Sequence, residues 1–304
     1  MRAITLILIL ALAGVGYFLF TPEGRQLIDR ARIKIMRTDY QARFRAGEKL
    51  PGTPALARLD ERLAAHGVAL GVPIYVRIFK LESELELWVQ KEGRFIRFAT
   101  YPICFWSGRL GPKLKEDDLQ APEGFYTVSA EQLNPKSRNH RSFDLGYPNV
   151  LDQAHGRTGS SLMVHGGCQS VGCYAMTDPV VDEIWRFVTA ALEMGQPRFP
   201  VHVFPFRMTD RNLTLRRGYK WESFWADLKK GYDLFEQAGL PPVVSVCKGR
   251  YVFALGSLET IAGVVKEGCR PEVSNLVPGP TGSNGSKLRA FGSTRRVVAY
   301  LAEW

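Results

Sequence analysis

Residues 161–178, SLMVHGGCQSVGCYAMTD, place one histidine and two cysteines within nine positions. Zinc sites, disulfides or redox dithiols, and cysteine nucleophiles paired with a base all use such residues. His165, Cys168 and Cys173 supply only three of the roughly four ligands that a structural zinc site needs. The C-x4-C spacing is also longer than the C-x-x-C of thioredoxin-like motifs. Metal binding and redox cycling are therefore the weaker alternatives, and a packing or disulfide role for the two cysteines stays open.

The third alternative gives Cys173 and His165 complementary roles. SVGC places Cys173 after a glycine and shortly before a predicted helix, whose free N–H groups and dipole would lower the thiol pKa. The N–H groups of VGC would also face an oxyanion as it develops. MVHG predicts a strand end that presents His165 at a glycine turn, where it can take the thiol proton and return it to a leaving amine. We therefore expect a Cys–His pair for acyl transfer.

Apolar periodicity predicts the strands that position this pair. From Pro73 onward PIYVRIFK, LELWVQ and RFIRFATYPI alternate with a period of two, which predicts a β-meander, and RFPVHVFPF predicts a further strand. Residues 107–124 are expected to form a long glycine- and proline-bearing loop. Residues 134–160 carry few strand signals, and we expect a second long loop there that serves as a binding wall.

Two long helices are predicted after the Cys–His segment. The first begins at Asp178 as its cap, has Pro179 in its first turn and ends at Gly195. Its predicted buried stripe consists of Val181, Ile184, Trp185 and Val188. The second covers residues 219–239 with an aromatic face that is expected to pack in the core.

The N-terminal segment predicts export. Residues 3–20, AITLILILALAGVGYFLF, carry no charge and would form roughly 27 Å of helix, close to the thickness of a bilayer core. We predict that residues 1–21 are a signal anchor or a cleaved signal peptide. Five basic residues follow closely, and the positive-inside rule would keep them in the cytoplasm, which conflicts with export. Residues 22–65 are predicted as a basic juxtamembrane helix or stalk, with Leu27, Ile28, Ala31 and Ile35 at helical spacing.

The composition is that of a folded protein with an anionic partner. The 304 residues carry a formal charge of +10, which favours nucleic acid, a membrane surface or a cell-wall polymer. No zinc-finger spacing, RNP-type motif or Lys/Arg block is present, so we do not predict nucleic-acid binding. The five cysteines fit one free thiol with up to two disulfides, whose pairing cannot be deduced from the sequence.

The order IYVRIFK, LELWVQKEG, SG, APEGFYTV, MVHGGCQSVGC resembles the YkuD-type L,D-transpeptidases. The strings GRLGPKLKEDDLQAPEGFY, LGYPN, GRTGSSLMVHGGCQSVGCYAMTD and FWADLKKGYDLFE resemble the YafK-like branch of that family. The resemblance covers about residues 70 to 250 and implies a mostly-β YkuD fold with flanking helices, of class α+β. We place this catalytic domain at residues 66–250 and a C-terminal extension, with a flexible linker and a basic tail, at residues 251–304.

Five site residues follow from the resemblance. It implies that Cys173 is the nucleophile and His165 the general base. It also implies that the backbone carbonyl of Gly166 orients the imidazole, while Ser170 and Gly172 shape the oxyanion loop. No metal or other cofactor is implied.

The sequence departs from the family pattern next to the cysteine. The histidine of the family's Ser-His-Gly-Cys is Val171 here, the Arg or Asn two places after the cysteine is Ala175, and the loop from His165 to Cys173 is shorter than usual. Another basic group would then hold the substrate. The candidates in the glycine-rich loops are Arg109, Lys113, Lys115 and Arg157.

The resemblance implies cysteine-dependent acyl transfer, by transpeptidation or hydrolysis, at meso-diaminopimelate amides of peptidoglycan stem peptides. For the YafK-like branch it points to editing or release of an outer-membrane protein or lipoprotein linked to peptidoglycan. The expected location is the periplasm, with attachment to the inner membrane through residues 3–20 unless they are cleaved. The alternative is a non-catalytic peptidoglycan-binding scaffold of the cell envelope.

Overall fold

The computed structural model describes residue 14 and residues 16–18, 21–260 and 263–269. The chain divides into residues Met1–Ser274 and residues Asn275–Trp304, and the second unit lies wholly outside the described residues. The predicted anchor at residues 3–20 lies mostly outside them, as do the predicted linker and basic tail. Within the described part of the chain, no helix is both long enough and apolar enough to cross a bilayer.

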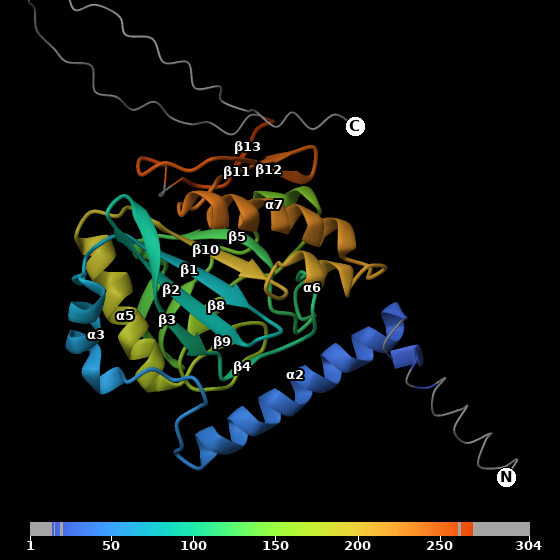
Figure 1. Cartoon of the computed structure of the whole chain (residues 1–304), viewed down its shortest axis with the longest axis horizontal. Coiled ribbons are helices and arrows are strands. Elements are labelled where there is room, and N and C mark those ends of the chain that lie inside the picture. The colour runs from blue at the N-terminus through green and yellow to red at the C-terminus, as the bar shows by residue number, and fades with distance from the viewer. Residues whose placement is uncertain (1–13, 15, 19–20, 261–262, 270–304) are drawn as a thin grey trace, which may run out of the picture. The chain divides into compact units, whose positions relative to one another are not determined.

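Two five-stranded sheets form the centre of the fold (Figure 1). The first has the order β3-β2-β1-β10-β5 and contains β1 (Ile74–Phe79), β2 (Glu84–Lys91), β3 (Arg94–Pro102), β5 (Gly124–Val128) and β10 (Phe199–Phe204). The second has the order β4-β9-β8-β7-β6 and contains β4 (Phe105–Trp106), β6 (Leu133–Ser137), β7 (His140–Asp144), β8 (Met163–His165) and β9 (Tyr174–Ala175). The predicted meander is confirmed, because β1, β2 and β3 pair antiparallel in chain order. Together with the helices, the sheets make a mixed α+β fold.

Helices and short 3-10 turns surround the sheets. They are α2 (Pro22–Arg45), η1 (Leu56–Arg58), α3 (Leu59–His66), η2 (Ala130–Gln132), α4 (Val150–Ala154), α5 (Asp178–Glu193), α6 (Asp210–Thr214) and α7 (Glu222–Ala238). The predicted buried stripe of α5 is confirmed, and the helix packs against β1 and β7. Its start differs from the prediction. Thr177, whose backbone is extended, occupies the N-cap position, while Asp178 is the first helical residue and its side chain accepts the Gly167 N–H.

The polar segment 134–160 is not a long loop, and the prediction was wrong there. It contains β6, β7 and α4. The strand β6 forms the edge of its sheet, and its five side chains are exposed or half-buried. A strand without a buried face has no reason to alternate apolar and polar residues, so periodicity could not reveal it.

A three-stranded sheet follows α7 and has the order β12-β11-β13, with β11 (Val243–Cys247), β12 (Arg250–Ala254) and β13 (Lys266–Glu267). Figure 1 shows α7 between this sheet and the first one. Gly231 permits this arrangement, because an added Cβ would lie 2.6 Å from ring atoms of both Phe125 on β5 and Phe253 on β12. The hairpin β11–β12 crosses the domain boundary predicted at residue 250. The hypothesis that YVFALG helps to complete the core is confirmed by the buried Tyr251.

The helix α2 packs on the domain through a face that the sequence did not indicate. Asp29 forms an ion pair with Arg216 at 2.8 Å, and Ile33 is buried. The Arg37 guanidinium lies 4.0 Å from the centroid of the Trp106 ring, and burial lowers the pKa of Arg37 to about 10. The predicted apolar stripe points outward instead, since its exposed members include Leu27, Ile28 and Ile35. The helix is therefore joined to the strand β4 beside the candidate site.

Candidate active site

The pairing of β8 with β9 brings His165 and Cys173 together. The two strands run parallel, with Val164 opposite Tyr174 and His165 opposite Ala175. Because side chains alternate between the faces of a sheet, Cys173 and His165 project from the same face of neighbouring strands. The Cys173 Sγ accepts the Met163 N–H at 3.3 Å and donates to the Ser161 carbonyl at 3.6 Å. The thiol is thus held beside Met163 at the start of β8, and the imidazole lies at the end of the same strand, as the sequence predicted.

The Nδ1 atom of His165 lies 2.6 Å from the carbonyl oxygen of Gly166. A carbonyl can only accept a hydrogen bond, so Nδ1 carries the proton and Nε2 keeps its lone pair. His165 is 2% exposed, which holds the ring between the strands. The contact expected from the family resemblance is therefore present, and the free lone pair suits a general base.

Burial keeps both partners neutral. It lowers the pKa of His165, a shift that the bond to Gly166 opposes. It also raises the pKa of Cys173, against the bond from Met163, while Asp144 raises this pKa further and Lys113 lowers it. The prediction that a helix N-terminus lowers the thiol pKa was therefore wrong. Cys173 leads into β9, and α5 begins only at Asp178. Both shifts favour the neutral thiol and the neutral imidazole.

One of two disulfides fixes the loop between His165 and Cys173. Cys168 is bonded to Cys104, which lies just before β4, and Cys247 is bonded to Cys269. Cys173 is the single free thiol, as the odd cysteine count predicted. The bond to Cys104 removes Cys168 from the zinc set and from the redox dithiol with Cys173. It also anchors the loop to the strand that pairs with β9.

Two serine hydroxyl oxygens accept hydrogen bonds from the loop N–H groups that were expected to face an oxyanion. The Gly172 N–H donates to Ser107 Oγ at 2.6 Å, and the Cys173 N–H donates to Ser170 Oγ at 2.7 Å. Ser170 Oγ donates in turn to the Cys173 carbonyl at 2.7 Å. No acceptor for the Ser107 hydroxyl proton is found in the described residues. Ser107 was not predicted as a site residue, although Ser107 opens the SG pair that carried part of the family resemblance.

The four basic candidates occupy different environments. Lys113 is buried, and its Nζ donates to Asp118 at 2.7 Å. Arg157 is buried in an ion pair with Asp152 at 2.6 Å. The side chains of Arg109 and Lys115 are exposed. Lys113 and Arg157 thus have internal partners already, and Lys113 contributes to the site through its effect on the thiol pKa.

The residue that replaces the family's histidine, Val171, is 73% exposed. Because position 171 is a valine, the loop between His165 and Cys173 carries no second imidazole near the nucleophile. Ala175 is fully buried and pairs with both Phe105 and His165 across the sheet. A long basic side chain has no room at that position, so substrate charge must be met by other residues.

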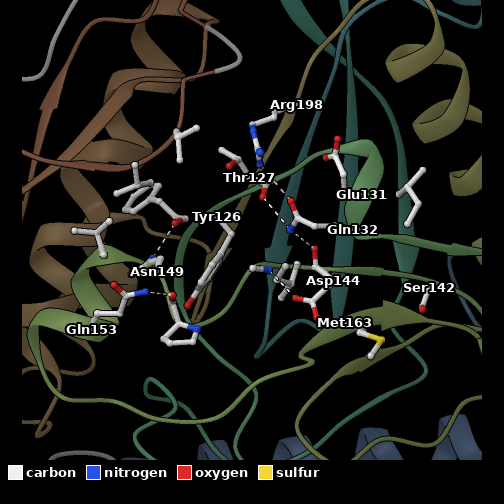
Figure 2. Close-up of a pocket in the computed structure, with 18 of the residues that line it drawn as sticks. Tyr126, Thr127, Glu131, Gln132, Ser142, Asp144, Asn149, Gln153, Met163 and Arg198 are labelled. Carbon is white, nitrogen blue, oxygen red and sulfur yellow. Dashed lines mark hydrogen bonds between the residues drawn. The ribbon is translucent and has the colours of Figure 1, made fainter.

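A cavity of about 610 Å³ (Figure 2) is lined by Ser142 and Met163, which neighbour the Cys–His pair, although neither Cys173 nor His165 lines it. Met163, whose N–H contacts the thiol, lines it together with Asp144 and Ser142. The Ser142 hydroxyl is buried without a hydrogen-bond partner within the described part of the chain, and its residue pairs with His165 in the sheet. Further polar lining residues are Glu131, Gln132, Asn134, Asn149, Gln153 and Arg198.

A hydrogen-bonded row crosses the wall of this cavity, as Figure 2 shows. Arg198 donates to Gln132 at 3.3 Å, and Gln132 donates to the carbonyl oxygen of Asp144 at 2.8 Å. Burial raises the pKa of Asp144. None of the three was predicted as a site residue: Asp144 lies in β7, where a loop was expected, while Gln132 in η2 and Arg198 before β10 carry no motif. The cavity can receive a polar, extended chain with charges of both signs.

Comparison with known proteins assigns the fold. The family model of the YkuD L,D-transpeptidase catalytic domain matches residues 75–203. The chain is 49% identical over 183 residues to YafK of Escherichia coli (strain K12), a candidate L,D-transpeptidase, and the match covers 60% of this chain and 74% of YafK. The chain belongs to the YkuD family of L,D-transpeptidases. The YkuD residues matched include both β8 and β9, which carry the Cys–His pair.

Solved structures show more distant similarity. Pgp2 of Campylobacter jejuni, a helical cell shape determining protein, matches with 20% identity and a TM-score of 0.36, over 59% of this chain and 64% of that one. Bd1075 of Bdellovibrio bacteriovorus matches with 14% identity and a TM-score of 0.32, over 55% of this chain and 72% of that one. At these TM-scores, membership of the YkuD family rests on the sequence similarity alone.

Proposed function

We propose that this protein is a cysteine enzyme that acts by acyl transfer at meso-diaminopimelate amides of peptidoglycan, and that it edits or releases links between proteins and peptidoglycan. The observation that carries the proposal is the single free thiol, Cys173, on the same sheet face as His165 and bonded to Met163, which lines a cavity with charged and polar side chains. Membership of the YkuD family supports peptidoglycan stem peptides as the substrate class.

The first half-reaction uses the neutral pair. The Nε2 atom of His165 takes the thiol proton as the Cys173 sulfur attacks the amide carbonyl on the L-centre of diaminopimelate. The Gly166 carbonyl accepts the Nδ1–H bond throughout, and it stabilises the imidazolium that forms. The imidazolium then gives its proton to the leaving amine, the C–N bond breaks, and a thioester remains.

The developing oxyanion needs hydrogen-bond donors near the thiol. The Ser107 hydroxyl proton is free to serve, and the Ser107 oxygen is held by the Gly172 N–H. The Cys173 N–H can join if Ser170 turns towards its other partner, the Cys173 carbonyl. In the second half-reaction an amine or water attacks the thioester, and His165 removes the proton of the attacking group. Transpeptidation and hydrolysis differ only in that acceptor.

The cavity provides recognition for the peptide. Asp144 and Glu131 offer carboxylates to ammonium groups, while Arg198 offers a guanidinium to a carboxylate. The Ser142 hydroxyl, which is buried and unpaired in the described structure, offers a further bond beside His165. Branched stem peptides contain both kinds of charge, which matches this lining.

The two disulfides and the peptidoglycan substrate support a location outside the cytoplasm. We propose the periplasm, with residues 3–20 as an inner-membrane anchor or a cleaved signal. The outward face of α2 then follows directly on that segment.

To test the proposal, the full chain is incubated with tetrapeptide muropeptides and, separately, with protein-linked muropeptides. Intact mass would detect a thioester, and chromatography would separate released D-alanine, released protein and cross-linked products. We expect the adduct and all turnover in the wild type and neither in Cys173→Ala, while His165→Gln slows adduct formation by roughly 10²- to 10⁴-fold.

The products of wild-type turnover identify the acceptor, and product from the protein-linked muropeptide establishes link release. If the wild type forms no adduct and releases nothing from either substrate, the enzyme proposal fails. Retention of peptidoglycan by both wild type and Cys173→Ala would then establish the envelope scaffold.

A further inference from the structure

One peptide group connects the imidazole to a carboxylate. The carbonyl oxygen of Gly166 accepts the Nδ1–H of His165 at 2.6 Å, and the N–H of the same peptide group, on Gly167, donates to Asp178 Oδ1 at 2.7 Å. Both bonds therefore belong to one planar amide, which lies between the ring and the acid. Asp178 is the first residue of α5, and its side chain turns back to the end of β8.

The amide transmits charge because its nitrogen lone pair is delocalised into the carbonyl. A carboxylate at the N–H end polarises the group and increases the electron density on the carbonyl oxygen, and hydrogen bonds in such a chain strengthen one another. A more negative oxygen holds the Nδ1–H tautomer of His165 more firmly. It also stabilises the imidazolium that must form while the thiol attacks.

The absence of a side chain at Gly166 makes this arrangement possible. An added Cβ would lie 2.5 Å from Asp178 Oδ1 and 3.2 Å from Val181 Cγ1, so any side chain would displace the carboxylate. The turn is fixed on its other sides as well. The Gly166 N–H donates to the Arg141 carbonyl at 3.3 Å, and the Met176 N–H donates to the His165 carbonyl at 2.7 Å.

We propose that Asp178 is a positioning residue that acts on His165 through the peptide group between Gly166 and Gly167. The third member of the site is then the Gly166 carbonyl, whose peptide group is polarised by the Asp178 carboxylate at its N–H end. This inference rests on the proposed function, because it assigns Asp178 to the reaction in which His165 takes and returns the thiol proton. Asp178 touches neither the substrate nor the reacting atoms.

Other charged groups face this turn and must be separated from Asp178. Asp182, one helical turn further on α5, lies 2.7 Å from His140 Nε2 and 3.4 Å from Arg141 Nε. His140 and Arg141 belong to β7, and the His140 Cβ packs against the turn at Gly166. Cys173, which precedes β9, is the titratable group on the side of His165 where the reaction takes place. Asp182 has no hydrogen bond to the turn, so Asp182→Asn is the matched control for loss of one nearby carboxylate.

The decisive variant is Asp178→Asn, since its amide oxygen can still accept the Gly167 N–H while the charge is lost. We expect kcat to fall roughly 10-fold with little change in KM, in keeping with other residues that act through a ligand-orienting contact. The acid limb of the pH profile moves down by about one pH unit, because the imidazolium loses a favourable charge. Asp182→Asn keeps the wild-type profile within about twofold, and Asp178→Glu recovers part of kcat.

A titration of His165 by NMR in the full chain, without substrate, gives a second measurement. We expect the pKa of His165 to fall in Asp178→Asn and to keep its wild-type value in Asp182→Asn. An unchanged His165 titration in Asp178→Asn, or an equal shift in both variants, overturns the proposal. If the wild type turns over no muropeptide, the proposed function has failed, and the NMR titration alone still decides whether Asp178 acts on His165.

Discussion

Removal of the disulfide between Cys104 and Cys168 tests whether that bond fixes the loop that carries Cys173. The two cysteines are 64 residues apart in sequence, and both are buried next to Leu50. In the chain-entropy description, closing a loop of that length stabilises the folded state by about 4 kcal/mol. We therefore expect Cys104→Ala/Cys168→Ala to lose up to about 4 kcal/mol of unfolding free energy. That loss corresponds to a melting temperature lower by roughly 8–16 °C.

Catalysis should suffer as well as stability. Cys168 lies between His165 and Cys173, and its bond to Cys104 ties their loop to the strand β4. A displacement of about 1 Å between reacting groups can cost roughly 10²-fold in rate. We expect kcat of the double variant to fall by roughly 10- to 100-fold at a temperature where it remains folded.

Chemical denaturation, with turnover measured in parallel, checks both effects. The control is Cys247→Ala/Cys269→Ala, whose cysteines are 22 residues apart and join the end of β11 to the segment after β13. The same description gives this disulfide about 3 kcal/mol, so its removal should cost less stability and leave kcat nearly unchanged. The reasoning is refuted if the Cys104/Cys168 variant unfolds with wild-type stability, or if both variants lose the same fraction of kcat.

Three further changes have defined outcomes. Burial lowers the pKa of His165 below 6.5 and raises that of Cys173 above 9.0. We therefore expect kcat/KM, measured from pH 4 to 9, to be flat across neutral pH and to fall only below pH 6.5. An acid limb with its midpoint above pH 6.5 would contradict the lowered pKa of His165. Gly166→Ala places a methyl group against α5 and should lower the free energy of unfolding, measured in denaturant, by about 1–3 kcal/mol. The loss of kcat should be larger than this loss of stability alone explains. Wild-type stability and wild-type kcat would disprove the close contact. Lys80→Met leaves the fully buried Glu123 without its ion-pair partner and should cost about 3–5 kcal/mol, part of which Lys80→Met/Glu123→Gln restores; an equally unstable double variant would argue against the pair.

Local sequence patterns predicted the parts of the fold that depend on nearby residues. The period-two runs gave β1, β2, β3 and β10, because each of these strands has buried side chains that alternate or run continuously. The helical stripe of α5 and the aromatic face of α7 were likewise readable. Types and spacing alone also singled out His165 and Cys173. They failed for β6, whose exposed edge position needs no apolar pattern.

What the sequence by itself determined is the composition of the site: one histidine and one free cysteine on a short segment that resembles the YkuD family. The tertiary structure alone decided which atoms surround them. Cys104, Ser107 and Asp144 reach the site from distant segments, and burial, which no local pattern states, reversed the predicted direction of the thiol pKa. The same holds for Asp178, which the sequence predicts as a helix cap. Only the folding of α5 against the end of β8 places its carboxylate on the peptide group that orients His165.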